Sequence, residues 1–159
     1  MKTVIYEGGR WLAVLCLVIW IITAGLSHKI SDAVPEDVRD AVIAVLETDN
    51  MEEADAKMVK RLYGIDPAAY EGCFLYSPVS NMDAEELLIV KMKDPADADA
   101  LTAAAEARVE TQKKSFEGYG ISQYDLLTNH CVIETAGNYM LFVVNQNADV
   151  AKAAFLAAL

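Results

Sequence analysis

The chain has 159 residues, of which 24 are acidic and 13 are basic, so its formal net charge is −11 at pH 7. This length fits one folded domain of ordinary size beside a short terminal segment. Because a strongly acidic surface repels phosphate backbones, the composition excludes nucleic acid as a partner.

The first predicted element is an uncharged apolar segment at residues 11–28, immediately after Arg10. As a helix these 18 residues span about 27 Å, close to the thickness of bilayer hydrocarbon. We expect a single-pass transmembrane anchor whose partner is the lipid bilayer. The alternative is a cleaved secretory signal.

The orientation of this segment follows from its flanks. Residues 1–10 carry Lys2, Arg10 and the free amino terminus, and basic residues favour the cytoplasmic side. We therefore expect residues 1–10 to be a cytoplasmic stub, residues 29–34 a linker and residues 35–159 an exported domain. The predicted location is the cell membrane, with the domain outside.

Two helices are expected at the start of the exported domain. Pro35 suits the first turn of a helix whose apolar residues recur at helical spacing up to Leu46. The second helix follows a turn at residues 48–50 and ends at Gly64 in a left-handed cap. Its apolar face is expected to contain Met51, Ala54, Met58, Val59 and Leu62.

A hairpin is expected next, from strands at residues 73–76 and 86–93. In the second strand Leu88, Val90 and Met92 alternate with Leu87, Ile89, Lys91 and Lys93. We expect the first set to pack on helices and the face with the lysines to be partly in water.

Asp94 and Pro95 are expected to cap and open the longest helix, which Gly118 and Gly120 end. The spacing predicts a buried face formed by Leu101, Ala105, Val109, Gln112 and Phe116. After an irregular stretch, a second hairpin is expected from residues 131–135 and 139–145. A last helix from about residue 147 presents Val150, Phe155, Leu156 and Leu159.

The predicted order ααββαββα indicates an α+β domain with a mostly antiparallel four-stranded sheet. Cys73 and Cys131 both fall in predicted strands. A disulfide between them requires neighbouring strands, and two buried free thiols are the alternative.

Candidate sites for chemistry are sparse. Adjacent residues of a strand point to opposite faces, so His130 and Cys131 do not form a nucleophile and base pair, and a small hydrolase is the weaker alternative. The pattern Asp94, Asp97, Asp99 lacks the glycine and distant glutamate of a calcium loop, and no spacing suits zinc. We expect no cofactor, no metal and no catalytic site.

Two surfaces are candidates for ligand or partner contact. The first combines Lys91 and Lys93 with Tyr76 or Tyr139 from neighbouring strands, in a pocket suited to a small ligand or glycan. The second is the irregular stretch with Tyr119, Tyr124 and Asn129, because loops on a rigid scaffold often carry function. The alternative is that these side chains only cover the edges of the core.

Four short motifs occur in a recognisable order: LYGID at residues 62–66, LIVKMKD at 88–94, Tyr119 with Gln123 and Asn129, and GNYML at 137–141. In this succession, over about residues 50–157, the chain resembles the bacterial family called domain of unknown function 4358. The resemblance implies a domain at the outer face of a bacterial membrane, linked to the cell envelope. It implies no activity and assigns no catalytic residue. A non-enzymatic interaction or accessory module with an unknown membrane or envelope protein as partner is therefore expected, and a small-ligand or glycan-binding domain is the alternative.

Overall fold

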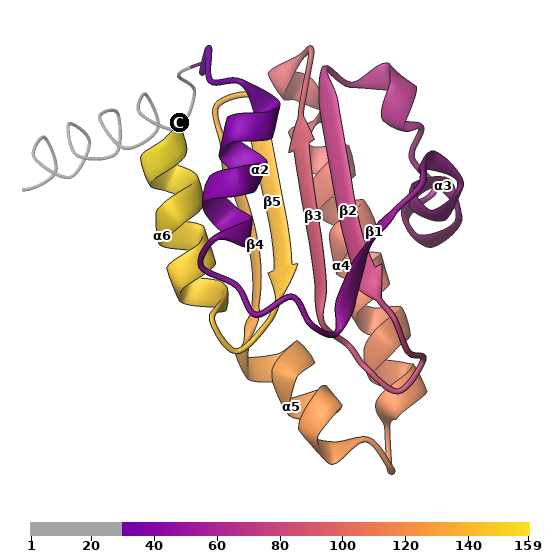
Figure 1. Cartoon of the computed structure of the whole chain (residues 1–159). Helices are drawn as coiled ribbons and strands as arrows, with labels where there is room; N and C mark the ends of the chain where they lie inside the picture. Colours follow the sequence, from indigo (N-terminus) through magenta and orange to yellow (C-terminus); the bar gives the residue numbers. More distant parts are fainter. Residues whose placement is uncertain (1–29) are drawn as a thin grey trace, which may run out of the picture.

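The computed structural model describes residues 30–159, which form a five-stranded antiparallel sheet with helices on both faces (Figure 1). The predicted anchor at residues 11–28 and the stub before it lie outside the described residues. Among residues 30–159, no helix combines the length and apolar character needed to cross a bilayer. The expected α+β class is confirmed.

The sheet has the spatial order β1-β2-β3-β5-β4, and every neighbouring pair is antiparallel. Its strands are β1 Met51–Ala54, β2 Gly72–Pro78, β3 Glu86–Lys91, β4 Cys131–Ala136 and β5 Tyr139–Val144. The helices are α2 Pro35–Ile43, α3 Ala56–Tyr63, α4 Ala98–Phe116, α5 Ile121–Asn129 and α6 Ala148–Ala158, with 3-10 turns η1 Pro67–Ala69 and η2 Pro95–Asp97.

The prediction of four strands was wrong by one strand, because β1 is a strand and not the first turn of the second helix. Met51 lies opposite Pro78, and Ala54 lies opposite Leu75. Pairing with β2 outweighs the helical preference of a four-residue segment. The helix starts later, where the Asp55 carboxylate accepts a hydrogen bond from Met58 N at 2.9 Å, and it ends at Gly64 with φ of 70° as expected.

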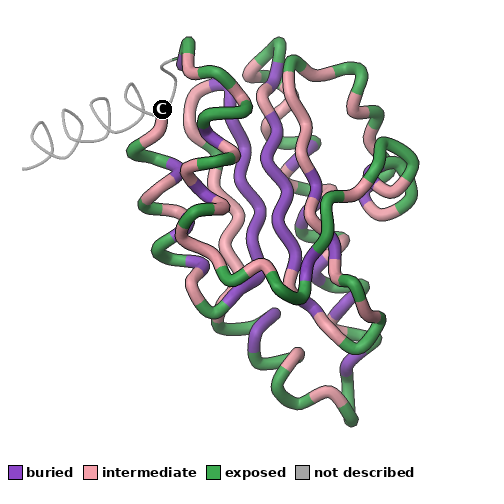
Figure 2. The backbone as a smooth tube through the Cα atoms, viewed as in Figure 1, coloured by how far each residue is buried: buried purple, intermediate pink, exposed green. Residues whose placement is uncertain are grey.

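Both faces of the sheet are covered, so the expectation of a partly wet face was also wrong. Leu88 and Val90 of β3 face α3 and α4, whereas Leu87 and Ile89 face α2 and α6, and all four are fully buried. The central strands are buried along their length while the outer surfaces of the helices are exposed (Figure 2). The sheet is therefore the middle layer of three.

The long helix has the expected buried face but begins later than expected, at Ala98. The Asp94 carboxylate accepts a hydrogen bond from Ala96 N at 2.9 Å and caps η2, which leads into α4. The five residues of its predicted inner face are all buried. The last helix is rotated from the expected orientation: Ala148, Ala151 and Phe155 are buried, and Val150 and Leu156 are exposed.

Helix α5 occupies a stretch that was expected to be irregular. It buries Leu126 and Leu127 against the α3/α4 side of the core. Gly120 permits the tight corner between α4 and α5, because a Cβ there would lie 2.5 Å from Phe116 Cδ1. The corner is thus determined by one close approach that the sequence pattern does not display.

Candidate functional site

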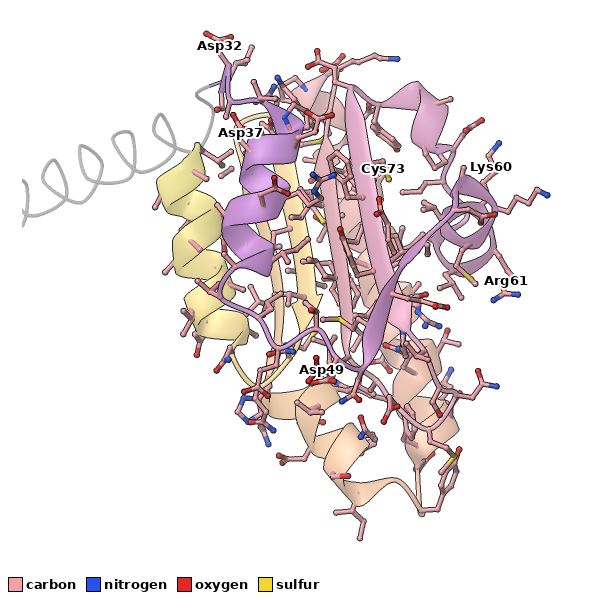
Figure 3. All side chains as sticks on the ribbon, viewed as in Figure 1. Asp32, Asp37, Asp49, Lys60, Arg61 and Cys73 are labelled. Atoms are coloured by element: carbon pink, nitrogen blue, oxygen red, sulfur yellow. The ribbon has the colours of Figure 1, made fainter. Side chains whose placement is uncertain are left out.

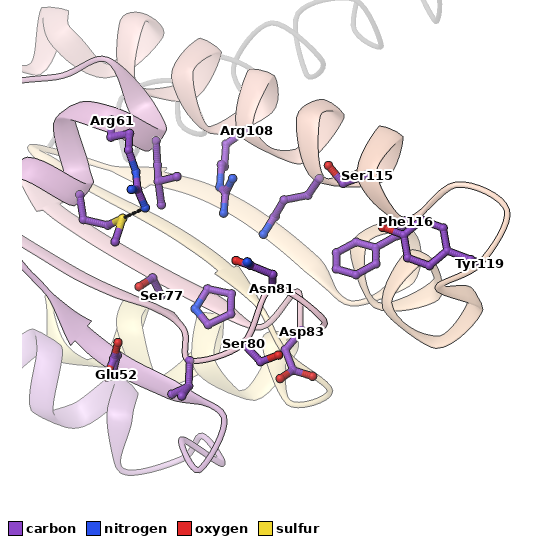
Figure 4. A pocket seen from close by; sticks show the side chains of 15 residues that line it. Glu52, Arg61, Ser77, Ser80, Asn81, Asp83, Arg108, Ser115, Phe116 and Tyr119 are labelled. Atoms are coloured by element: carbon purple, nitrogen blue, oxygen red, sulfur yellow. Dashed lines mark hydrogen bonds between the residues drawn. The ribbon is translucent and has the colours of Figure 1, made fainter.

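A cleft of about 540 Å³ opens on the α3/α4 face of the sheet, between these two helices (Figure 4). Glu52 of β1 and Ser77 of β2 contribute from the sheet, and Arg61 and Arg108 contribute from α3 and α4. The loop between β2 and β3 closes one side, with Asn81 pointing into the space from opposite Arg108 (Figure 4). Its volume lies within the range of sites that hold small molecules.

A buried carboxylate organises the α4 wall of this cleft. Glu86, the first residue of β3, is fully buried. Its Oε1 accepts a hydrogen bond from the Tyr63 hydroxyl at 2.5 Å, and its Oε2 accepts from Arg108 Nη2 at 2.7 Å and from Gln112 Nε2 at 2.9 Å. Arg108 Nε lies 3.1 Å from both oxygens. Because the charge is paired and hydrogen-bonded, its burial is tolerated.

The groups around Glu86 keep fixed protonation states. Burial, followed by the nearby charge of Glu86, raises the pKa of the Tyr63 hydroxyl well above its ordinary value. Burial by itself lowers the pKa of Arg108, but the hydrogen bond and charge of Glu86 outweigh it and the net shift is upward. Tyr63 therefore stays neutral and Arg108 stays charged across the physiological pH range.

Gln112 has one unsatisfied atom. A carboxylate only accepts hydrogen bonds, so the amide nitrogen must face Glu86 and the amide oxygen must face away. This Oε1 is buried and has no hydrogen-bond donor among the described residues. Gln112 is also one of the residues that line the cleft. A buried acceptor without a protein donor is uncommon in folded proteins and requires a partner, either a water molecule or a ligand group.

Two residues of the first predicted surface do meet, but their polar atoms are already occupied. Lys91 Nζ lies 5.6 Å from the ring centroid of Tyr139 and 3.2 Å from the Glu71 carboxylate. Both Lys91 Nζ and the Tyr139 hydroxyl donate to the carbonyl of Ala33, at 3.1 and 2.6 Å. These contacts hold residues 30–34 against the sheet, where Ser31 N also donates to Asn138 Oδ1.

The other two residues of that surface lie elsewhere. Tyr76 is opposite Leu87, whereas Lys91 is opposite Gly72, so Tyr76 and Lys91 are separated by four positions along the strands. Lys93 is exposed and donates to the carbonyl of Ala68 in η1. The structure therefore does not bring Lys91, Lys93, Tyr76 and Tyr139 into one site.

The second predicted surface is divided between two locations. Tyr119 lines the cleft, and its ring centroid lies 6.2 Å from that of Phe116. Tyr124 lies on α5, beside a smaller hollow that includes Ile121. Asn129, at the end of α5, donates to the Asp125 carboxylate one turn earlier. Of the seven predicted contact residues, Tyr119 is thus the one that the structure places in the cleft.

His130 and Cys131 lie where α5 ends and β4 begins. His130 follows the last residue of α5, and burial raises the pKa of the Cys131 thiol to about 11, which keeps the thiol protonated. Residues 30–159 contain no group of three or more His, Cys, Asp or Glu side chains able to hold a metal ion.

The sequence interpretation missed Tyr63, Glu86 and Arg108 as site residues. One signal was available for two members of the network. Glu86 is a charge directly before four apolar residues of β3, and Gln112 is the one polar residue on the buried face of α4. A polar group on an otherwise apolar face requires a partner, and two such positions in neighbouring elements indicate each other.

Comparisons with known proteins place the chain in a family without a described activity. No curated protein and no solved structure matches it. The family described as domain of unknown function (DUF4358) matches residues 44–145, from before β1 to the end of β5. This range contains all five strands and every residue of the cleft. The chain therefore belongs to the DUF4358 family.

Proposed function

We propose that this protein is a membrane-tethered, non-enzymatic accessory module of the cell envelope that binds a small ligand in the cleft between α3 and α4. The cleft, with side chains held by the buried Glu86, is the observation that carries the proposal. Residues 11–28 supply the tether and the folded domain lies outside the membrane.

Fixed protonation favours binding over acid and base chemistry. A general acid or base works best when its pKa lies near the working pH. Tyr63 and Arg108 are shifted away from that range, and both are held by Glu86. Groups of this kind are suited to positioning a ligand by hydrogen bonds that do not change during the encounter.

A cleft-filling variant tests ligand binding before the ligand is identified. Ser115 is exposed on α4 and lines the cleft, and its neighbour Lys114 is exposed and does not. The full chain in detergent is mixed with pools of neutral sugars, amino acids, short peptides and organic anions, and binding is followed by saturation-transfer NMR. At least one pool should bind the wild type and Lys114→Trp but not Ser115→Trp.

This part of the proposal fails if no pool binds the wild type. It fails equally if a pool binds Ser115→Trp as well as it binds Lys114→Trp, because binding then takes place outside the cleft.

The tether is tested by fractionation and protease treatment of whole cells. The intact chain should remain in the membrane after alkaline extraction, and external protease should degrade the domain. A shortened chain in the medium would show that residues 11–28 are cleaved, and protection from protease would show that the domain is not outside.

An exposed apolar corner favours a protein partner as a second candidate function. Tyr119, Ile121 and Tyr124 are 64%, 82% and 41% exposed at the junction of α4 and α5. Clustered exposed apolar side chains are typical of interaction sites. Ile121→Asp should abolish co-purification of a membrane partner in detergent, whereas Val150→Asp on α6 should retain it. Equal recovery with both variants would exclude this corner as the contact.

A further inference from the structure

Arg108 and Gln112 stand one turn apart on α4, and Glu86 fixes both. Glu86 occupies Nε and Nη2 of Arg108 and Nε2 of Gln112. Glu86 does not use Arg108 Nη1. Within the described residues Gln112 Oε1 has no donor. The α4 wall therefore carries a donor that Glu86 leaves open beside an acceptor without a partner, and both side chains line the cleft.

This donor and acceptor couple is electrically neutral. The positive charge of Arg108 is cancelled by Glu86 at 2.7 Å, and Tyr63 and Gln112 carry none. Elsewhere in the lining, Arg61 is accompanied by the carboxylates of Glu52 and Asp83. Lys60, the neighbour of Arg61 on α3, does not line the cleft and extends outward (Figure 3). A charged ligand would meet a group of its own sign in the cleft, whereas a neutral ligand would not.

The rest of the lining suits hydroxyl groups and the apolar face of a sugar ring. Ser77, Ser80, Ser115 and Asn81 add short side chains that both donate and accept hydrogen bonds. At the α4–α5 end, Phe116 is buried and Tyr119 is largely exposed, so the Tyr119 ring is free to cover a ligand. Aromatic rings combine apolar contact with specific geometry.

We infer that the cleft binds a neutral, hydroxyl-rich ligand of mono- or disaccharide size, with one ligand hydroxyl accepting from Arg108 and a neighbouring one donating to Gln112 Oε1. Because this oxygen is buried, the second contact requires the Gln112 amide to turn towards the cleft. A hydroxyl satisfies either role, which matches the unused pair. The inference rests on the proposed function, since it names the ligand class of the same cleft.

The test compares neutral sugars with charged and amide-bearing compounds on the full chain in detergent. Maltose, cellobiose and lactose represent the proposed class, galacturonate an anionic sugar, lysine a cation and N-acetylalanine amide a peptide group. Titration followed by NMR should show binding of at least one neutral disaccharide, at least 10-fold tighter than galacturonate, lysine or the amide.

Two variants with matched controls locate the contacts. Tyr119→Ala should weaken disaccharide binding about 3- to 10-fold, whereas Tyr124→Ala, outside the cleft, should not change it. Gln112→Leu should weaken it by a similar factor, and Gln146→Leu, at an exposed position between β5 and α6, should not. If Gln112→Leu does not fold, the two tyrosine variants decide.

The outcomes separate this inference from the proposal it rests on. Cleft binding of galacturonate, lysine or the amide in preference to disaccharides overturns the ligand class but leaves a ligand-binding module. Disaccharide binding that is unchanged in Tyr119→Ala and in a folded Gln112→Leu overturns the assigned contacts. Failure of all three disaccharides to bind overturns the ligand class. Failure of every compound here and of every pool in the Ser115→Trp experiment overturns both.

Discussion

The two faces of the sheet share the same strands but are closed in different ways. On the α2/α6 face, Leu87, Leu141 and Phe155 are fully buried, and polar contacts occur at the end that holds Lys91 and Tyr139. On the α3/α4 face, β3 begins with the equally buried Glu86, which draws in partners from α3 and α4. One carboxylate at the start of a strand thus changes an apolar helix–sheet contact into a polar site, because its buried charge must be satisfied.

The largest expected loss of stability comes from a cavity in the core on the α2/α6 face. Phe155→Ala should lower the free energy of unfolding by about 4 kcal/mol, since it removes a fully buried ring from the contact with Tyr139. Urea unfolding of the full chain in detergent measures this change. Leu156→Ala, on the exposed side of α6, should cost less than about 1 kcal/mol. Similar losses for the two variants would contradict the assigned helix orientation.

Breaking the polar face should have the next largest effect. Glu86→Gln leaves the charge of Arg108 without its partner and should cost about 3 kcal/mol in the same unfolding measurement. Glu134→Gln is the control, because its 2.6 Å ion pair with Lys152 is partly exposed and is worth less than about 1 kcal/mol. A neutral or stabilising Glu86→Gln would show that the network does not hold the α4 wall.

Alkaline pH should lower the free energy of unfolding through a buried tyrosine on each face of the sheet, Tyr63 on the α3/α4 face and Tyr139 on the α2/α6 face. Burial raises the pKa of Tyr139 to about 12, so the folded state binds this proton more tightly than the unfolded state. Stability is therefore fully present below pH 10 and falls as the pH rises from 10 towards 12, by at most about 1.4 kcal/mol per pH unit for one group. Tyr139→Phe should give a shallower decline in unfolding free energy between pH 9.5 and 11.5, and an unchanged slope would refute the assignment.

Adding a reductant should change the free energy of unfolding least of all these treatments. β3 and β5 separate Cys73 on β2 from Cys131 on β4, three strand spacings or about 14 Å. This exceeds the separation that a disulfide bridges. In a Cys16→Ser background, reductant should change the free energy of unfolding by less than about 0.5 kcal/mol. Both thiols should react slowly at pH 7.5, because burial raises the pKa of each to about 11. A reductant-dependent mobility on a gel would contradict the strand order.

Long elements with a regular apolar pattern were predictable from the sequence, and short elements that depend on their neighbours were not. The buried face of α4 and the two hairpins follow from spacing alone. β1 has only four residues, and its extended form depends on pairing with β2, which a local pattern does not display. α5 carries few apolar residues at helical spacing, and its corner depends on the contact between Gly120 and Phe116.

The site was less predictable than the fold for a related reason. Glu86, Arg108 and Tyr63 come from three elements that are distant in sequence, and their meeting depends on how α3 and α4 cross β3. Tyr119 was selected because loops carry function, and it does line the cleft. Lys91 and Tyr139 were selected as a patch, but they bind the Ala33 carbonyl instead, because residues 30–34 pack over them.

The first and last described residues lie close together, since the Ser31 hydroxyl donates to the carbonyl of Leu159 at 3.0 Å. Both emerge at one pole of the domain, and the loop between β2 and β3 lies at the other (Figure 1). A circular permutant that joins residue 159 to residue 30 and opens the chain at Asn81 would keep every strand pairing. The same geometry places any fluorescent or affinity tag fused after Leu159 beside the point where the N-terminal segment enters the fold, far from the cleft.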